Sequence, residues 1–471
     1  MEIDEFRSHA HQMVDWMADY LAGIESLPVR AQTRPGEVAD RLPAAAPVTA
    51  EPMHRIMADF QRDILPGITH WQHPSFFAYF PANSSPPSVL AEMLTATIGA
   101  QCMLWQTSPA ATEMETRVLA WLGGMIGLQD GFHGVIQDSA SSAVLAALLM
   151  ARERVTDGAA NRDGLTGQPA MTVYCSDQTH TSAEKGAKIA GFGQRHVRKI
   201  ASDENFAMRP EALEAAIQAD RDAGLRPACV IASLGATGVG AIDPLQAIGE
   251  ICCRHGIFLH VDAAWAGSAL ILPEYRAMLQ GQEYADSFVF NPHKWLMTNF
   301  DCAAHFVRDP DALIRTFAID AAYLHSREAG QVIDYRDWGV QLGRRFRALK
   351  LWFVIRSYGV EGLRAILRRH IGLAAAVEQW IEAADDFQMM APRVLSLVNF
   401  RYAPPGADAD RCDALNRQLL ERLNDSGEAY FTPNVVRGRQ AIRFAIGQTR
   451  TEARHVELAW ALICRTARAL D

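Results

Sequence analysis

The sequence predicts an α/β protein built around a mostly parallel sheet that helices cover on both faces. Between residues 86 and 310, short apolar runs of strand length alternate with helical segments, which is the pattern of parallel strands joined by helical crossovers. Small and polar residues directly follow these runs, at the strand ends where open α/β sheets bind ligands. The expected strands are 134–137, 171–175, 229–233, 257–262 and 287–291.

The composition limits the class of protein and its partners. The chain has 471 residues, 49% of them hydrophobic and 21% charged, which is typical of a soluble globular protein with a large core. A net charge of −9 without a long basic run argues against a nucleic-acid partner. No apolar run reaches the roughly 18 residues that suggest a membrane span, and the acidic start of the chain lacks the features of a signal peptide.

Cysteine usage and missing motifs exclude several function classes. Eight scattered cysteines without a C-x-x-C motif predict reduced thiols in a cytoplasmic protein, and neither a disulfide framework nor a metal site is expected. The sequence has no G-x-G-x-x-G after a strand, and no G-x-x-x-x-G-K-[ST], H-E-x-x-H or G-x-S-x-G motif. Dinucleotide, P-loop, zinc-protease and α/β-hydrolase functions therefore lose their usual support.

An amphipathic helix is predicted over 2–25, because apolar residues between Phe6 and Met17 recur at helical spacing. A helix at the start of a chain has little of its own chain to pack against. It is therefore expected to cover a partner subunit, with a membrane surface as the less favoured alternative. A proline-rich linker over 28–50 and a second helix near 51–65 follow it.

Residues 70–87 form an aromatic-rich segment that has the turn chemistry of a loop and includes Trp71, Tyr79 and Phe80. Aromatic side chains gathered in a loop indicate a binding wall. They are equally typical of residues that fill the core beneath a long loop. Composition alone leaves both interpretations open.

The first two strand ends carry hydroxyl groups and a histidine. Ser139 and Ser141 open a strong helix after strand 134–137, and a helix N-terminus suits a phosphate group, although plain serine capping explains the pattern as well. His180 follows strand 171–175. It could stack on a flat ring or transfer a proton, but a lone histidine is more often structural.

The last two strand ends carry a carboxylate and an amine. Asp262 ends an apolar strand, where burial is costly unless the charge pairs with a cation; a protonated pyridine nitrogen would serve. Lys294 follows strand 287–291 between aromatic and aliphatic neighbours. Desolvation there favours the neutral amine that a Schiff-base lysine needs. Considered without the rest of the chain, however, Lys294 is better interpreted as a surface lysine.

The remainder of the chain suggests a lid and a small α/β domain. Residues 319–337 lack helical or strand periodicity, which predicts a long mobile loop of the kind that covers active sites. Beyond this loop, the expected elements are helices 342–358 and 361–382, separated by Gly359, short strands 394–402 and 441–446, and a helix over 451–470.

Taken together, a phosphate cradle, a ring-stacking residue, a buried carboxylate and an amine are the parts that pyridoxal phosphate requires. The sequence resembles the group II pyridoxal-phosphate decarboxylases, specifically the aromatic L-amino acid decarboxylases. The resemblance is densest in Asn291-Pro292-His293-Lys294-Trp295, His260-Val261-Asp262-Ala263-Ala264, Phe77-Ala78-Tyr79-Phe80-Pro81 and Leu342-Gly343-Arg344-Arg345-Phe346-Arg347.

This resemblance implies a homodimer of the PLP-dependent fold type I, with active sites at the subunit interface. It implies an N-terminal helical dimerisation segment (1–85), a large cofactor-binding α/β domain (86–345) and a small C-terminal α/β domain (346–471). The implied catalytic residues are Lys294 for the Schiff base, Asp262 for the pyridine nitrogen, His180 for stacking on the ring, and Tyr323 as proton donor. The implied cofactor-binding residues are Ser139, Ala140, Ser141, His180, Thr237, Asp262, Ala264, Asn291, His293 and Lys294. The implied substrate-binding residues are Trp71, Tyr79, Phe80, Pro81, Ala82, Gln101, Met103 and Gly343.

The implied reaction is the decarboxylation of tryptophan, phenylalanine, tyrosine or dihydroxyphenylalanine to an arylalkylamine. Gly343 leaves room that suits an indole. An aldehyde-forming oxidative decarboxylation is the first alternative, although Tyr323 favours the simple reaction, and glutamate or histidine decarboxylation is the second. A non-catalytic scaffold is the third. Asp138 departs from the family pattern before the phosphate-binding serine and is expected to turn away from the phosphate.

Overall fold

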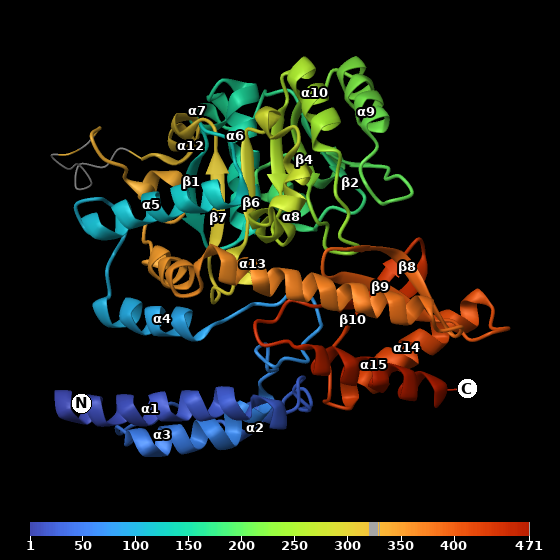
Figure 1. Ribbon diagram of the computed structural model, residues 1–471. Helices are drawn as coiled ribbons and strands as arrows, with labels where there is room; N and C mark the ends of the chain where they lie inside the picture. Colours follow the sequence, from blue (N-terminus) through green and yellow to red (C-terminus); the bar gives the residue numbers. More distant parts are fainter. Residues whose placement is uncertain (320–327, 329, 471) are drawn as a thin grey trace. The chain divides into compact units, whose positions relative to one another are not determined.

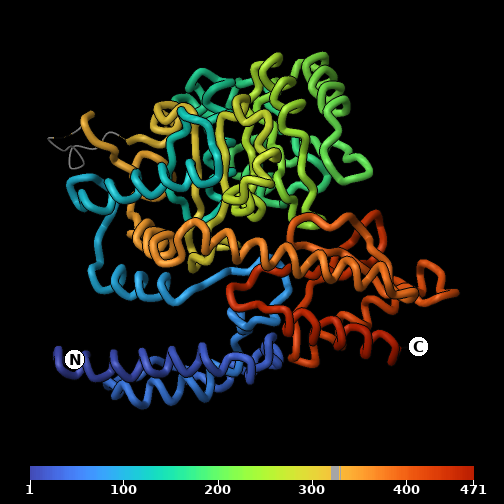
Figure 2. The backbone as a smooth tube through the Cα atoms, viewed as in Figure 1, coloured from blue at the N-terminus to red at the C-terminus, as the bar shows by residue number. Residues whose placement is uncertain are grey.

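The computed structural model describes residues 1–319, 328 and 330–470. The chain forms two compact units: a small unit of residues 1–81, 373–390 and 398–471, and a large unit of residues 82–372 and 391–397. Each unit is described by itself. Figure 2 traces how the chain leaves the small unit after residue 81 and returns to it within the long helix α13 (orange).

A seven-stranded sheet forms the centre of the large unit, in the order β1-β7-β6-β5-β4-β2-β3 (Figure 1). β7 runs antiparallel to its two neighbours, β1 and β6, while the pairs from β6 through β3 are parallel. The predicted mostly parallel sheet is thereby confirmed. The strands are β1 His133–Gln137, β2 Met171–Ser176, β3 Val197–Ile200, β4 Arg226–Ser233, β5 Phe258–Asp262, β6 Ser287–Phe290 and β7 Ala303–Val307.

Helices lie on both sides of this sheet (Figure 1). The alanine- and leucine-rich α6 packs on β4, β5, β6 and β7, and fully buried residues such as Val144, Val173 and Ile231 form the core there. The helices of the large unit are α4 Pro86–Ile98, α5 Pro109–Ile126, α6 Ala140–Thr156, α7 Ala159–Asp163, α8 Ser182–Ile189, α9 Pro210–Asp222, α10 Leu245–His255, α11 Pro292–Trp295, α12 Pro310–Phe317 and the first part of α13 Arg347–Glu382. The 3-10 helices used below are η5 Ala266–Ile271 and η9 Tyr335–Trp338.

The small unit combines helices with a four-stranded sheet of order β10-β11-β9-β8. Its core combines aliphatic and aromatic side chains, and within it Phe77 contacts Phe431 and Phe444. Its helices are α1 Ile3–Gly23, α2 Glu37–Arg41, α3 Met53–Asp59, α14 Ala409–Asp425 and α15 Ala453–Arg468. The strands of the sheet are β8 Phe387–Val394, β9 Leu397–Tyr402, β10 Thr432–Val436 and β11 Arg439–Ala445.

Several elements differ from the sequence expectations. Residues 394–402 do not form one strand: β8 and β9 meet at a tight turn in which Leu395 has a φ of 51°. The sequence did not indicate β8 or β10 because each contains a proline, which counts against strand assignment. The break at Gly359 is confirmed, since its φ of 64° and ψ of 167° interrupt the helical backbone of α13.

The three-domain division into 1–85, 86–345 and 346–471 stays a prediction. The compact units follow different boundaries, because the N-terminal segment and the C-terminal sheet cluster together. Within the residues that the structure describes, no helix is both long and apolar enough to cross a membrane.

Candidate active site

The ends of β4, β5 and β6 lie in register at one edge of the parallel sheet. Ser233 is paired with Asp262, and Asp262 with Val289. Beyond the strands, Ala263 N donates to Val289 O at 2.9 Å and Asn291 N donates to Ala264 O at 2.9 Å. The backbone therefore holds the segment after β6 beside the segment after β5.

Asp262 is a buried carboxylate at this edge, 9% exposed. Its Oδ1 accepts a hydrogen bond from Ala264 N at 3.0 Å, which fixes the side chain relative to the loop that follows β5. The prediction that an apolar strand ends at this carboxylate is thereby confirmed.

Lys294 lies on the short helix α11, directly after β6. Asn83 holds the backbone before and after the Cα atom of Lys294. Asn83 N donates to His293 O at 2.9 Å, and Asn83 Nδ2 donates to Lys294 O at 2.7 Å. The next residue, Trp295, is fully buried and stacks on Trp265 with ring centroids 5.3 Å apart. The lysine is therefore carried by a firmly packed turn.

His180 lies after β2 in a fixed orientation. Its Nδ1 accepts a hydrogen bond from Ser182 N at 3.2 Å and lies 2.8 Å from Ser182 Oγ, so the ring proton of the neutral form is on Nε2. Partial desolvation lowers the pKa of His180, the charge of Lys294 lowers it further, and Asp262 opposes both. The three side chains therefore share one electrostatic environment.

The predicted phosphate-binding segment, called the phosphate loop below, is the turn from β1 into α6. Ser139 caps the helix, since its Oγ accepts a hydrogen bond from Ser142 N at 3.3 Å, as serine capping predicted. Ala140 at the start of this helix packs in one apolar cluster with Val289 near the end of β6 and with Ala264. The helix N-terminus, with its free N–H groups, is thus tied to the strand ends that carry Asp262 and Lys294.

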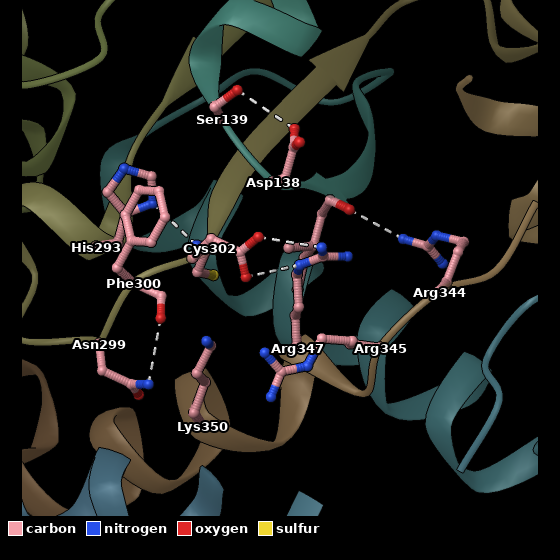
Figure 3. A network of polar contacts seen from close by, with 12 residues as sticks. Asp138, Ser139, His293, Asn299, Phe300, Cys302, Arg344, Arg345, Arg347 and Lys350 are labelled. Atoms are coloured by element: carbon pink, nitrogen blue, oxygen red, sulfur yellow. Dashed lines mark hydrogen bonds and ion pairs between the residues drawn. The ribbon is translucent and has the colours of Figure 1, made fainter. Parts of the chain in front are cut away.

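Asp138 precedes this helix and points toward neighbouring donors (Figure 3). Ser139 Oγ donates to Asp138 Oδ1 at 3.3 Å, and Gln341 Nε2 donates to its Oδ2 at 3.3 Å. The expectation that Asp138 turns away from a bound phosphate stays a prediction.

Two further side chains fit a phosphate group. Asn291 is 3% exposed, and within the described residues nothing donates a hydrogen bond to its Oδ1, so this carboxamide lacks a partner that a ligand could supply. His293 Nδ1 accepts a hydrogen bond from Cys302 N at 2.9 Å (Figure 3), which leaves an N–H on Nε2. Burial, followed by the charge of Lys294, lowers the pKa of His293 to about 3, so it is a neutral donor.

A buried ion pair that the sequence reasoning did not identify supports this loop. Arg344 donates to Glu115 Oε1 at 2.6 Å and to Ile136 O at 2.9 Å, and Glu115 Oε1 also accepts from Ile136 N at 2.9 Å. Glu115 is therefore bound to the strand that ends at the phosphate loop. The only signal was the run 342–347, in which Arg344 had no assigned role.

A second ion pair joins α13 to the segment after Lys294. Arg347 donates to both carboxylate oxygens of Asp301 at 3.1 Å, as the dashed lines at Arg347 in Figure 3 show. Lys350 is fully buried and lies 3.3 Å from Glu92 Oε1. These charges fix the far side of the turn that carries His293.

The predicted substrate residues are divided between the two units. In the small unit, Trp71 and Tyr79 are partly exposed and stacked with centroids 5.7 Å apart, while Phe80 and Pro81 are buried. Tyr79 has a φ of 50°, a strained conformation that Arg443 supports by donating to Tyr79 O at 3.1 Å. Phe80 and Pro81 are thus core residues, while a binding wall that includes Trp71 and Tyr79 stays a prediction.

In the large unit, Gln101 and Gly343 lie in contact. Gln101 Oε1 accepts a hydrogen bond from Arg344 N at 2.6 Å, and its Nε2 lies 3.2 Å from where a Cβ at position 343 would be.

Ala82, Met103 and Thr237 also belong to this unit. Met103 O accepts from Arg336 N at 3.0 Å, and Thr237 lies in the turn after β4. Tyr323 lies outside the described residues.

The mostly parallel sheet with polar residues at its strand ends defines the class of open α/β proteins that bind a ligand beyond the carboxyl ends of their strands. The comparisons identify the family within that class. Residues 35–403 match the pyridoxal-dependent decarboxylase conserved domain. The chain belongs to this family of carboxy-lyases, and its cofactor is pyridoxal phosphate.

Relatives of known name match along nearly the whole chain. Phenylacetaldehyde synthase from Arabidopsis thaliana is 43% identical over 473 residues, covering 98% of this chain and 96% of the relative. Tryptophan decarboxylase 2 from Oryza sativa subsp. japonica is 42% identical, covering 98% and 94%. The crystal structure of Oryza sativa TDC with PLP and tryptamine superposes with a TM-score of 0.96 at 38% identity, covering 100% of this chain and 99% of that one.

Proposed function

We propose that this enzyme removes the carboxylate of an aromatic L-amino acid to give an arylalkylamine and carbon dioxide. The observation that supports the proposal is the register of β5 with β6, which places Asp262 at the strand end beside the one that Lys294 follows. The charges of both residues also act on the pKa of His180. Relatives named tryptophan decarboxylase and tyrosine decarboxylase, 42% and 43% identical, support the substrate class.

Each side chain of the site has a physical task in this proposal. Lys294 binds the cofactor covalently, and Asp262 holds a proton on the pyridine nitrogen because a buried carboxylate needs a cationic partner. His180 would stack on the ring of the bound cofactor, with its Nδ1 held by Ser182. When bound, pyridoxal phosphate supplies the electron sink for the electron pair left on Cα when carbon dioxide leaves.

Phosphate binding is assigned to neutral donors and to one helix N-terminus. The backbone of Ala140 and Ser141 begins α6, where the helix dipole favours an anion. Asn291 supplies its carboxamide and His293 its Nε2–H. Thr237 and Ala264 flank the ring. Tyr323 is assigned the delivery of a proton to Cα after carbon dioxide has left.

Binding of the aromatic side chain of the substrate is assigned to two sets of residues, one in each unit. Trp71, Tyr79, Phe80 and Pro81 belong to the small unit, and Ala82, Gln101, Met103 and Gly343 belong to the large unit. The test is product analysis with tryptophan, phenylalanine, tyrosine, dihydroxyphenylalanine, glutamate and histidine. Amine from the aromatic substrates is expected. Amine from glutamate or histidine in their place would overturn the assigned substrate class.

Loss of the lysine provides a second test of the site. In Lys294→Ala the absorbance band of the lysine-bound cofactor and carbon dioxide release should both disappear. Retention of the band would contradict the role of Lys294. The wild-type protein without any band would support a non-catalytic scaffold instead.

An aldehyde synthase is the second candidate, because phenylacetaldehyde synthases are 43% and 41% identical to the chain. That reaction consumes one amino acid, oxygen and water, and it gives aldehyde, carbon dioxide, ammonia and hydrogen peroxide. Tyr323 favours the amine, since a proton placed on Cα ends the reaction before oxygen can act.

Tyr323→Phe is expected to retain carbon dioxide release while its product shifts from amine toward aldehyde. Oxygen uptake and hydrogen peroxide should rise in step with the aldehyde, and an assay of all three products measures the partition. Unchanged amine yield in this variant would count against the role given to Tyr323.

We also propose a homodimer with active sites at the subunit interface, formed in the cytoplasm. α1 contains no buried residue although Ile3 and Phe6 are exposed apolar side chains. In the large unit, Leu90, Leu94 and Ile98 form one exposed apolar stripe along α4, and such contiguous faces mark interfaces. All eight cysteines are free thiols, as a reducing compartment allows.

A further inference from the structure

A cavity of about 290 Å³ lies in the large unit, away from the strand ends described above. It opens beside the first residues of β1, His133 and Gly134, whereas the phosphate loop follows the other end of this strand. α5 forms one wall, next to β1 (Figure 1). Its volume is near the lower end of the range for small-molecule pockets.

The floor of this cavity is apolar and aromatic. Leu119, Phe306, Tyr335 and Trp338 line it and are buried. The rings of Tyr335 and Trp338 meet edge to face, with centroids 5.4 Å apart. The Tyr335 hydroxyl lies 2.9 Å from Thr116 Oγ1, so its polar end already has a partner.

A glycine of α5 lies at the opening of the cavity. Gly124 lines the cavity and is exposed, and a Cβ added there would meet no atom within 4 Å. The cavity is therefore open to solvent beside this helix backbone, so a ligand could enter there.

The mouth of the cavity carries a carboxylate. Asp130 lines it, is exposed and forms no ion pair within the described part of the chain. The other titratable group on the rim is His133. Arg308 lies over the Phe132 ring at 4.4 Å and donates from Nε and Nη2 to Ala285 O and Gln282 O, while its Nη1 lies 3.9 Å from where a Cβ at Gly131 would be.

We propose that this cavity binds a primary arylalkylamine, with the aromatic ring on the Tyr335–Trp338 floor and the ammonium group at Asp130. The assignment of the ligand rests on the proposed function, because an arylalkylamine is the product of that reaction. Trp338 O accepts a hydrogen bond from Gln137 Nε2 at 3.0 Å, so a bound amine contacts the same short helix that holds the end of β1.

The test counts bound 2-phenylethylamine on the cofactor-loaded enzyme by equilibrium dialysis, while cofactor absorbance reports the active site separately. Two amines per chain are expected in the wild type. Gly124→Leu, which places a bulky side chain at the opening of the cavity and improves helix propensity, should bind one and keep the full absorbance response. Gly372→Leu is the matched control, since Gly372 is also helical and exposed with no atom within 4 Å of its Cβ position; it should bind two.

The charge at the mouth is tested with a neutral analogue. Asp130→Asn should weaken the second amine about tenfold, which corresponds to the loss of one charge-assisted contact, and leave 2-phenylethanol binding unchanged. One amine per wild-type chain, or two per Gly124→Leu chain, would overturn the proposal. The wild type could make no arylalkylamine while Gly124→Leu still binds one amine fewer than the wild type. That result would contradict the proposed function but support the second binding site.

Discussion

Gly343 and Gln101 together set the space in one part of the proposed substrate pocket. A Cβ at position 343 would come within 3.2 Å of Gln101 Nε2, closer than ordinary van der Waals contact. Gln101 is held by its hydrogen bond to Arg344 N. A side chain at 343 must therefore displace the Gln101 carboxamide, and the displaced group takes room from the largest substrate ring.

Gly343→Ser is therefore expected to lower kcat/KM for tryptophan relative to phenylalanine by about tenfold, the order of effect of one small group in a binding pocket. Steady-state assays with both substrates measure the ratio. Gln101→Ala in the same background should restore much of the ratio by vacating the space. A ratio that does not change in Gly343→Ser would remove both residues from the pocket.

Buried histidines make folding sensitive to acid. Burial lowers the pKa of His305 to about 3, and burial with the charge of Lys294 lowers the pKa of His293 to about 3. The unfolded chain binds these protons near pH 6.5. The stability that neutral histidines provide is therefore complete above pH 6.5 and is lost as the pH falls from 6.5 towards 3.

In His305→Gln the free energy of unfolding should depend less steeply on pH below pH 6.5. Unfolding of this variant takes up about one proton fewer, so the slope should fall by about 1.4 kcal/mol per pH unit. Glutamine can keep the hydrogen bond that joins His305 Nε2 to Ser287 Oγ at 2.8 Å. Urea unfolding at pH 7, 6 and 5 gives the slope. His54→Gln, at an exposed position, is the control, and an equal slope in the two variants would contradict the prediction.

At the scale of elements, η5 and β6 pack too closely for any side chain at Gly267. A Cβ there would lie 2.3 Å from Phe290 Cβ, and Phe290 directly precedes Asn291 and the turn that carries Lys294. Gly267→Ala should therefore destabilise the fold by about 1–3 kcal/mol, the usual effect of overpacking a core, and weaken cofactor retention. Urea unfolding and dialysis against cofactor-free buffer measure the two effects.

Gly372→Ala is the matched control for this change. Its Cβ would meet no atom within 4 Å in the middle of α13, so alanine should be neutral or stabilising by up to about 1 kcal/mol because of its higher helix propensity. Equal stability in Gly267→Ala and Gly372→Ala would show that η5 can move away from β6 at no cost.

The parallel strands could be predicted because each is a short buried run that ends in polar residues. β4, β5 and β6 lie where the sequence placed them, differing by a few residues at their ends. β8 could not be predicted in this way, because Pro392 and exposed polar residues interrupt its pattern. The 3-10 helix η9 falls within the stretch predicted as a loop, and its buried Tyr335 and Trp338 show no period in so short a segment.

Site residues that lie directly on strand ends could be predicted, while those that support them from a distance could not. Asp262 and Lys294 follow apolar runs that the sequence displays. Glu115 lies on α5, 229 residues from Arg344 in the chain, and only the folded backbone brings the two together. No local pattern distinguishes such a buried carboxylate from a solvated one on a helix face.

At the scale of the whole molecule, apolar surface remains uncovered on α4. Leu90 is 54% exposed, Leu94 44% and Ile98 61%, and their spacing of four places them on one helical face. A monomer would keep this stripe in water. A second copy of the chain, packed against it, would remove it from water, and the proposed interfacial active sites require such a copy.

Leu94→Glu together with Ile98→Glu is therefore expected to convert the dimer into monomers and to lower activity at least tenfold, because two desolvated carboxylates would cost several kcal/mol in the interface. Analytical ultracentrifugation measures the mass, and activity is assayed at the same concentrations. Leu458→Glu is the control, since Leu458 is exposed on α15 and should tolerate the charge. A dimer that persists with both glutamates would exclude α4 from the interface. Monomers with full activity would show instead that each chain completes its own site, because interfacial sites cannot survive the loss of the partner.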